Sequence, residues 1–364
     1  MHTAMRTITT LLLLLWLNLS LAATSPDSSS WQPDILGQGY EMRTVEQGKD
    51  YSGRVVSTIV RKLVADSIGT RRGVLYVHGF NDYFFNAPMG NEFVEHGYDF
   101  YAVDLRKYGR SILQGQKLFQ ARNLNEYFPD IDSALVVMQR TGLEEIVLMG
   151  HSTGGLISAY YIACNPQAPV EALILNSPFL DWNLGWKECL VPIISWWGTI
   201  APDTPIPQGK STAYAQSLLR SEHGYWDYNT SWKLPQSPDV TAGWVHAITQ
   251  AQNALRNGKA RISIPILLMY SSASVNGAEW TEEHNHADGV LDVADIRKYG
   301  RQLGPHVTCM KVVGGLHDLT LSNPALLKAL YPAVFHWLGE TFSADEAESA
   351  RPNPHPQPDS QPKL

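Results

Sequence analysis

Residues 145–164 read EIVLMGHSTGGLISAYYIAC, and three patterns follow one another in this short stretch. Residues 145–149 form an apolar run typical of a buried strand, and residues 154–164 have the pattern of a buried helix. Between them lies Gly150-His-Ser-Thr-Gly154, whose glycines allow a tight turn from the strand into the helix. This order predicts one strand-helix unit of a parallel sheet.

The same alternation of apolar runs and amphipathic segments continues along the chain. Helical patterns lie at 130–141, 154–164, 294–303 and 324–342. Most of the strand-like runs are uninterrupted, as strands buried on both faces require. These features predict an α/β fold with a mostly parallel sheet and helices on both faces. The predicted strands are residues 54–60, 73–77, 98–103, 145–149, 172–175, 264–270 and 307–313.

One long interval, residues 181–259, breaks this alternation because it has no strand signal. It is too long for a structureless connection, so we expect an inserted helical cap. The tryptophans of this interval either pack the cap onto the main domain or line an apolar pocket for an acyl chain or a ring. Seven of the eleven tryptophans lie here: Trp182, Trp186, Trp196, Trp197, Trp226, Trp232 and Trp244.

The two ends of the chain differ in composition from the domain expected at 31–342. Residues 1–22 show the charged, apolar and small-residue order of a secretory signal peptide, which predicts a secreted or periplasmic protein. A retained membrane anchor is the alternative, but the apolar run is short and is interrupted by Asn18 and Ser20. Residues 344–364 contain five prolines among polar residues and are expected to be a disordered tail.

Composition excludes several classes of protein. With 364 residues, of which 44% are hydrophobic, most of the chain can bury a core. A net charge of −7 and scattered basic residues give no surface for nucleic acid, so no such partner is expected. The three cysteines have no metal-binding spacing, and the apolar surroundings of Cys164 and Cys309 predict that both are buried.

The turn at residues 150–154 also has the pattern Gly-x-Ser-x-Gly of a nucleophile elbow, which predicts Ser152 as a nucleophile. The following helix would bring its N-terminal N–H groups to the reacting centre. Acyl transfer needs two donors for a negative oxygen, and the N–H groups of Phe80 and Thr153 are the candidates. His78, which precedes Phe80, is expected to hold its loop in place.

The general base should come late in the chain, because elbow enzymes follow the order Ser, acid, His. His317 follows two glycines after the strand at 307–313, which places it at the same edge of the sheet as Ser152. His306, His336 and His355 lie at a strand start, within a helix and in the tail, so each has a structural explanation.

The segment TEEHNHADGVLD at 281–292 concentrates four carboxylates and two histidines. His284 and His286 could in principle bind zinc. However, ligands two residues apart need a strand or a fixed loop, and the site would need further ligands. A nucleophile, a base and oxyanion donors complete an acyl transfer without a metal, so we expect neither a metal nor a cofactor.

The sequence resembles the α/β-hydrolases of the monoglyceride lipase, lysophospholipase and serine aminopeptidase-like group. The resemblance extends over residues 54–342, so it implies an α/β-hydrolase fold with a cap. This sequence departs from the family pattern at Phe80, a bulky residue in a loop where the family usually has small residues. The motifs that carry it are VHGF at 77–80, AVDLRKYGRS at 102–111, GHSTG at 150–154, ADGVLD at 287–292 and GGLH at 314–317.

The family's usual place for the acid, directly after the strand at 264–270, is occupied by serines and an alanine up to Ser274. The family pattern with a second Asp a few residues later matches Asp288 and Asp292. The resemblance therefore implies that Asp288 is the acid and that an insertion displaces it along the chain. Asp292 is the first alternative, with a structural role as a helix cap, and Glu282 or Glu283 are the others.

Together these features predict an exported serine hydrolase that cleaves carboxylic esters, such as an acylglycerol, a lysophospholipid or a small ester. A serine aminopeptidase or amidase remains open, because the cap contains carboxylates that could bind an amine. A non-catalytic binding protein on a hydrolase fold is the third hypothesis. The aromatic cap is also a candidate for peripheral contact with a membrane. The cap carboxylates are Glu188, Asp203, Glu222 and Asp227.

Overall fold

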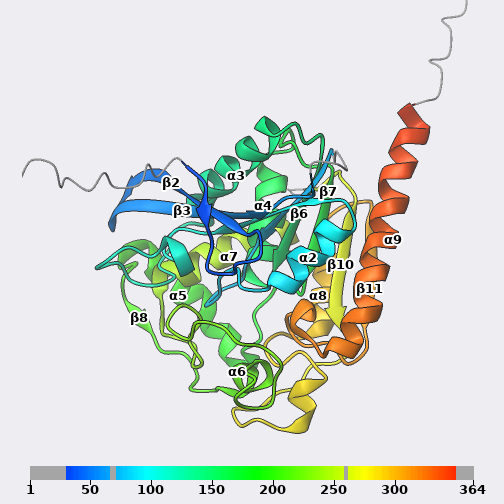
Figure 1. Ribbon diagram of the computed structural model, residues 1–364. Helices are drawn as coiled ribbons and strands as arrows, with labels where there is room; N and C mark the ends of the chain where they lie inside the picture. The colour runs from blue at the N-terminus through cyan, green and yellow to red at the C-terminus, as the bar shows by residue number, and fades with distance from the viewer. Residues whose placement is uncertain (1–29, 66–70, 258–260, 350–364) are drawn as a thin grey trace, which may run out of the picture.

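A computed structural model describes residues 30–65, 71–257 and 261–349, and its centre is a nine-stranded sheet (Figure 1). The strands lie in the order β1-β2-β3-β5-β4-β6-β7-β10-β11. All pairs from β5 to β11 are parallel, and the pairs from β1 to β5 are antiparallel. The strands are β1 (Gln32–Pro33), β2 (Glu41–Asp50), β3 (Gly53–Lys62), β4 (Arg72–Val77), β5 (Asp99–Asp104), β6 (Glu145–His151), β7 (Ala172–Asn176), β10 (Ile266–Ser271) and β11 (Val307–Val312).

The predicted mostly parallel α/β architecture is confirmed. Every apolar run expected to be a strand is one, and each boundary lies within two residues of the expected one. The strand β2 was not predicted, because it has no fully buried residue and therefore no apolar run. Most of β2 pairs only with β3, because its other neighbour, β1, is two residues long.

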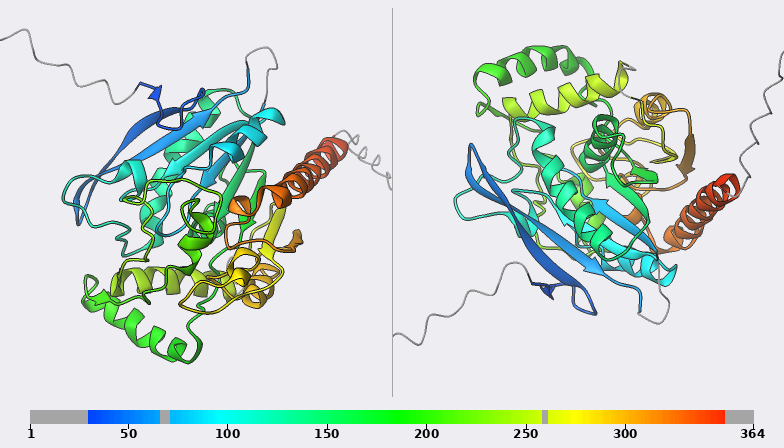
Figure 2. Two further views of the ribbon diagram at one scale, coloured as in Figure 1. Left: turned by 60° about the horizontal axis from the view of Figure 1, so that its bottom comes forward. Right: turned by 90° about the horizontal axis from the view of Figure 1, so that it is seen from above.

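Helices cover both faces of the sheet (Figures 1 and 2). On one face, α3 (Phe128–Arg140), α4 (Thr153–Cys164) and α8 (Val293–Gly300) bury their apolar residues against the strands. On the other face, α2 (Ala87–Glu95) and α9 (Pro324–Ser349) form a second core with the opposite side chains of the same strands. This alternation of side chains between two cores follows from the two-residue period of a strand.

The helix α9 begins as predicted but continues to Ser349. The expectation that a disordered tail begins at residue 344 is therefore wrong for residues 344–349. Alanine and glutamate favour a helix there, and the first proline comes only at Pro352. Residues 350–364 and the predicted signal segment at 1–22 lie outside the described residues. In the described part of the chain, no helix is long and apolar enough to cross a membrane.

The described part of the predicted cap, residues 181–257, lies beside one end of the sheet, at the bottom of Figure 1. Its regular structure is mainly helical, but β8 (Pro205–Ile206) and β9 (Val240–Thr241) also form a small antiparallel sheet, which was not predicted. Strands of two residues are too short to produce a pattern in the sequence. Its helical segments are η3 (Gly185–Leu190), α5 (Val191–Ile200), α6 (Ala213–Leu218) and α7 (Ala242–Arg256).

The motif at 102–111 forms buried ion pairs that hold the loop after β5. Arg110 binds both Asp34 and Asp104, and Arg106 binds Asp130. Burial raises the pKa of Asp130 to about 6, although the paired Arg106 opposes the shift. The motif's charged residues thus hold the loop in place. Because they are buried, each charge needs an oppositely charged partner.

All three cysteines are free and exposed, so the expectation that Cys164 and Cys309 are buried is wrong. Cys164 is the last residue of α4, and Cys309 lies on β11, a strand at the edge of the sheet whose residues are mostly exposed or half-buried. Apolar neighbours in sequence did not indicate the direction of these two side chains.

Candidate active site

Ser152 lies at the sharp turn between β6 and α4. Its backbone has φ 52° and ψ −117°, a conformation that non-glycine residues rarely adopt. The turn brings the start of α4 against the loop after β4. A Cβ at Gly154 would lie 2.3 Å from the carbonyl oxygens of both Val77 and His78, so only glycine fits there. The residues of the motif therefore hold Ser152 in the geometry expected of a nucleophile elbow.

The structure brings Ser152, His317 and Asp288 together in one hydrogen-bonded chain. His317 Nε2 lies 2.9 Å from Ser152 Oγ, and His317 Nδ1 lies 2.9 Å from Asp288 Oδ2. All three side chains are buried, and Asp288 is 0% exposed. With the Nδ1 proton on the side of Asp288, Nε2 is free to accept the Ser152 proton.

Asp288 reaches this position because the inserted loop returns to the end of β10. Its N–H donates to the Ala273 carbonyl at 2.9 Å, and its own carbonyl accepts from Val275 N–H at 2.8 Å. Asp288 thus lies beside Ser274, where the family usually has its acid. Its Oδ1 accepts from the N–H groups of Val290 and Leu291 at 2.8 Å each, which fixes the carboxylate plane.

The alternatives to Asp288 lie elsewhere. Asp292 caps α8 by accepting from Ala294 N–H at 2.8 Å, which is the structural role weighed for it. Glu282 and Glu283 are exposed on the short helix η4 (Glu282–Asn285). The structure therefore places only Asp288, of these four carboxylates, beside His317.

His284 and His286, the two candidate zinc ligands, lie in different surroundings. His284 is buried, and its Nδ1 lies within 3.1 Å of the Thr281 N–H and hydroxyl, so it stabilises the start of η4. His286 is exposed and lies 3.5 Å from Glu282. The two rings thus have separate surroundings, and the stretch at 281–292 contributes Asp288 to the site.

The two expected oxyanion donors border the same space. Phe80 and Thr153 both line the cavity that contains Ser152. The N–H of Thr153 is the first of α4, and such groups have no acceptor within their helix. His78 holds the loop of Phe80, since its Nδ1 donates to the Gly79 carbonyl at 2.8 Å and its Nε2 accepts from Leu105 N–H at 3.1 Å.

The cavity above Ser152 has a volume of about 400 Å³ and lies between the sheet and the cap. The bulky Phe80 forms part of its wall by packing on Phe119 and on Trp244 of the cap, with ring centroids 5.2 and 4.8 Å apart. Its polar lining includes Asn81, Gln208 and Lys233, and none of the described residues that line it carries a carboxylate. The apolar side chains of the wall include Phe80, Phe179, Trp182, Leu218, Val240, Trp244 and Val290.

The seven cap tryptophans fall into three groups: some line the cavity, some pack the cap onto the main domain, and others are exposed on the surface. Trp182 and Trp244 line the cavity, whereas Trp226 and Trp232 pack the cap onto the main domain. The remaining three, Trp186, Trp196 and Trp197, are exposed. The sequence could not distinguish these groups, because the contacts of a tryptophan depend on how the cap folds.

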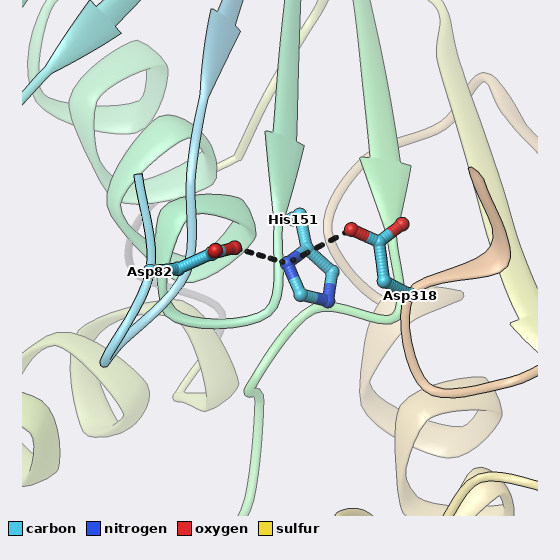
Figure 3. Close-up of side chains that lie close together, drawn as sticks. All are labelled: Asp82, His151 and Asp318. Atoms are coloured by element: carbon cyan, nitrogen blue, oxygen red, sulfur yellow. Dashed lines mark ion pairs between the residues drawn. The ribbon is translucent and has the colours of Figure 1, made fainter. Parts of the chain in front are cut away.

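A buried group of charged side chains behind Ser152 was not predicted. Asp82 and Asp318 lie on the loops after β4 and β11, and His151 is the last residue of β6. His151 Nδ1 lies between the two carboxylates (Figure 3). Lys233 of the cap binds Asp82 at 3.0 Å. The place of Asp82, His151 and Asp318 at the carboxyl edge of the parallel sheet is a signal that could have found them. Lys233 has no such signal.

Comparison with known proteins identifies the family. Residues 69–275 match the model of the family described as serine aminopeptidase, S33. The chain is 26% identical over 218 residues to the AB hydrolase superfamily protein YisY of Bacillus subtilis, covering 57% of this chain and 76% of that protein. It is 23% identical over 300 residues to the probable lysophospholipase L2 of Haemophilus influenzae, covering 78% and 89%.

A solved structure with the same fold is a soluble variant of monoglyceride lipase from Saccharomyces cerevisiae. The TM-score is 0.59 at 16% identity, with 82% of this chain and 94% of that chain covered, and this likeness shows the fold alone. The family match covers more than half of the chain and contains Ser152 and the cap, and it ends at the start of the inserted loop. The chain therefore belongs to the serine aminopeptidase S33 family and is a lipase- and lysophospholipase-like hydrolase with the α/β-hydrolase fold.

Proposed function

We propose that this hydrolase is a serine esterase that cleaves carboxylic esters of an acylglycerol, a lysophospholipid or a smaller alcohol. The observation that carries the proposal is the pair of 2.9 Å contacts from Ser152 to His317 and from His317 to Asp288 at the base of an apolar cavity. This arrangement has the geometry of an acyl-transfer triad.

In the proposed reaction, Ser152 Oγ attacks the ester carbonyl carbon while His317 Nε2 takes its proton. The carbonyl oxygen becomes negative and is stabilised by the N–H groups of Phe80 and Thr153. The intermediate collapses as His317 returns the proton to the leaving alcohol, which leaves an acyl group on Ser152. Water, activated by His317, then releases the acid and restores the enzyme. Asp288 stabilises the imidazolium at both stages.

The lining of the cavity supports esters over peptides with a free amino terminus. An aminopeptidase needs a carboxylate for the substrate ammonium group, and the lining formed by the described residues supplies none. The cap carboxylates considered for that role are engaged or lie elsewhere. Asp203 binds Arg122 and Gln120, Asp227 binds Arg220, and Glu188 accepts from Leu184 N–H. Glu222 is exposed.

A panel of p-nitrophenyl esters with acyl chains of two to sixteen carbons, run beside aminoacyl anilides, tests the function. We expect ester hydrolysis with a preference for acyl chains that fill a cavity of about 400 Å³. Activity on the anilides should be lower than activity on the best ester by about 10²-fold or more. A fluorophosphonate probe should label the protein. Faster cleavage of anilides would favour the aminopeptidase, and a folded protein without labelling or turnover would favour the binding protein.

Peripheral contact with a membrane is a further part of the proposal, and it is supported by an apolar patch on the cap. Trp186, Ile193, Trp196 and Ile200 are between 57% and 78% exposed. Spacings of three and four residues put most of the patch on one helical face. Leu184 belongs to both the patch and the cavity wall, so the patch continues to the cavity. The patch comprises Leu184, Trp186, Leu190, Ile193, Trp196, Trp197 and Ile200.

We expect the protein to bind phosphatidylcholine vesicles through this patch, because burying apolar side chains in the bilayer interface lowers the free energy. The double variant Trp186→Ser/Trp196→Ser should weaken binding by about tenfold or more in a sedimentation assay. The control is Ile35→Ser/Val313→Ser, which removes exposed apolar side chains outside the patch. Equal binding by both double variants would contradict a role for the patch.

We also propose that the protein is exported. The support comes from the sequence alone, namely the order of charged, apolar and small residues at 1–22. These residues lie outside the described structure. Sequencing the N-terminus of the protein from the cell exterior or the periplasm tests this. Processing after Ala22 or Ala23 is expected, and a retained Met1 would favour the anchor.

A further inference from the structure

Four buried charged or titratable groups follow one another beside Ser152, from Lys233 of the cap through Asp82 and His151 to Asp318 on the loop after β11. Lys233 Nζ donates to Asp82 Oδ1 at 3.0 Å. The other oxygen, Asp82 Oδ2, lies 3.6 Å from His151 Nδ1, and Asp318 Oδ2 lies at the same distance on the other side (Figure 3). All four side chains are less than 9% exposed. The charge of His151 therefore decides the net charge of the group.

The two carboxylates present their free oxygens to His151. Asp318 Oδ1 accepts from Asn176 Nδ2 at 2.7 Å and from the N–H and hydroxyl of Thr320 at 3.0 and 2.7 Å. Asp82 Oδ1 is held by Lys233. Each Oδ2 thus remains to face the imidazole. Burial opposes ionisation of Asp82, but Lys233 and His151 outweigh it and lower the pKa of this carboxyl below its usual range.

His151 has no hydrogen bond to compensate for its burial. It is 3% exposed, and both ring nitrogens lack a partner within the described structure. A separation of 3.6 Å is too long for a hydrogen bond, so the attraction between His151 and the carboxylates is one of charge. A neutral ring would leave the group with one uncompensated buried negative charge, whereas a protonated ring brings its net charge to zero.

From this arrangement we propose that His151 is a buried imidazolium that acts as a positioning residue for the catalytic base. Its positive charge makes protonation of His317 less favourable and so extends the esterase activity to lower pH. The ring centroids of His151 and His317 are 4.9 Å apart, a distance at which buried charges interact strongly. The effect on activity rests on the esterase function proposed above, but the protonation state of His151 does not.

Groups from every neighbouring segment contribute to the field at His151. The loop after β4 supplies His78 and Asp82, of which His78 is held neutral because burial lowers its pKa. The loop after β11 supplies His317 and Asp318, with Asp288 behind His317. The cap supplies Lys233 and Tyr214, and burial raises the pKa of the Tyr214 hydroxyl well above its usual range. Among these groups, the charge of His151 balances the second carboxylate.

The oxyanion loop approaches the His151 ring closely at Gly79. A Cβ at Gly79 would lie 3.1 Å from His151 Nδ1 and 3.1 Å from Ser152 Cβ, so the absence of a side chain allows this approach. Because His151 precedes Ser152 directly, its attraction to the carboxylates also holds the elbow from behind.

A bound divalent metal is the other chemistry that two carboxylates and an imidazole could support. We favour the imidazolium because the Lys233 ammonium group already lies 3.0 Å from Asp82 and would repel a second cation. Elemental analysis of the purified protein separates the two. One equivalent of metal in the wild type that is absent from His151→Asn would overturn the proposal.

The pH dependence of kcat/KM for ester hydrolysis tests the charge of His151. His151→Asn removes a positive charge, so we expect the acid limb of the profile to move to higher pH by about one unit. Asp318→Asn removes a negative charge and keeps an oxygen to accept from Thr320, so the limb should move to lower pH. The double variant has the wild-type net charge, and its limb should return close to that of the wild type.

His246→Asn is the matched control, because His246 bonds to Ser195 in the cap and lies outside the charged group. Its acid limb should not move, and thermal unfolding should show that all variants are folded. An unmoved limb in His151→Asn, or shifts of the same sign in both single variants, would overturn the proposal.

Nitrogen-15 NMR of histidine-labelled protein gives a readout that does not need catalysis. In an imidazolium the two ring nitrogens resonate close together, and in a neutral ring they resonate far apart. We expect the His151 signal, assigned by its loss in His151→Asn, to show an imidazolium at pH 7. A neutral ring would overturn the proposal even in an active enzyme. An imidazolium in a protein without esterase activity would instead count against the proposed function.

Discussion

Replacement of Ser152 by alanine should lower ester turnover by about 10⁴- to 10⁶-fold. The variant lacks the oxygen that forms the acyl-enzyme, and His317 has no proton to accept in its place. The fold should remain, because alanine removes one buried hydroxyl and no backbone contact. Steady-state kinetics and labelling by a fluorophosphonate probe measure the effect, and the variant should not be labelled.

His317→Ala should have a loss of similar size, because the nucleophile and the base act as a unit. Ser158→Ala is the matched control, since Ser158 is also buried on α4 near the turn and its hydroxyl has no hydrogen-bond partner within the described structure. We expect Ser158→Ala to keep wild-type turnover. If Ser152→Ala retained most activity while folded, another nucleophile would have to be sought.

The second large effect is expected from Asp288→Asn, at about 10⁴-fold in kcat. Asp288 Oδ1 is fixed by two N–H donors, those of Val290 and Leu291, so the asparagine carbonyl oxygen would occupy that place. Its amino group would then face His317 Nδ1. The imidazole would be held in the opposite tautomer, with a proton on Nε2, and could not accept the proton of Ser152.

Asp292→Asn makes the same change four residues away and separates the two acids. Asparagine is as good a helix cap as aspartate and can still accept from Ala294 N–H, so activity and stability should both remain close to wild type. Asp292→Ala should lower the free energy of unfolding by about 1 kcal/mol without affecting turnover. If Asp292→Asn lost activity and Asp288→Asn kept it, the acid role would belong to Asp292.

Local patterns were sufficient for much of the fold. The strands β4, β6, β7 and β10 are buried on both faces, so each is a continuous apolar run that can be read without knowing its neighbours. The elbow can be read for the same reason, because the glycines that allow the tight turn lie two residues before and after Ser152. His317 follows from chain order and from its place after β11.

Other features left little trace in the sequence because they depend on distant contacts. The strand β2 is stabilised by pairing with β3 and has no buried residue, so it lacks a periodic apolar pattern. The exposure of Cys164 and Cys309 depends on which side of an element faces the core. The position of Asp288 depends on an inserted loop that returns to Ala273 through backbone hydrogen bonds, which any sequence of suitable length could make.

By itself, then, the sequence determined the parallel part of the sheet, the family resemblance, and the candidates Ser152 and His317, because those features rest on local patterns and on chain order. The tertiary structure decided which carboxylate meets His317, which tryptophans line the cavity, and that Lys233, Asp82, His151 and Asp318 meet behind the elbow. The interactions among these residues join segments as far apart in sequence as β4, the cap and β11. A charge becomes significant there because burial removes the water that would otherwise screen it.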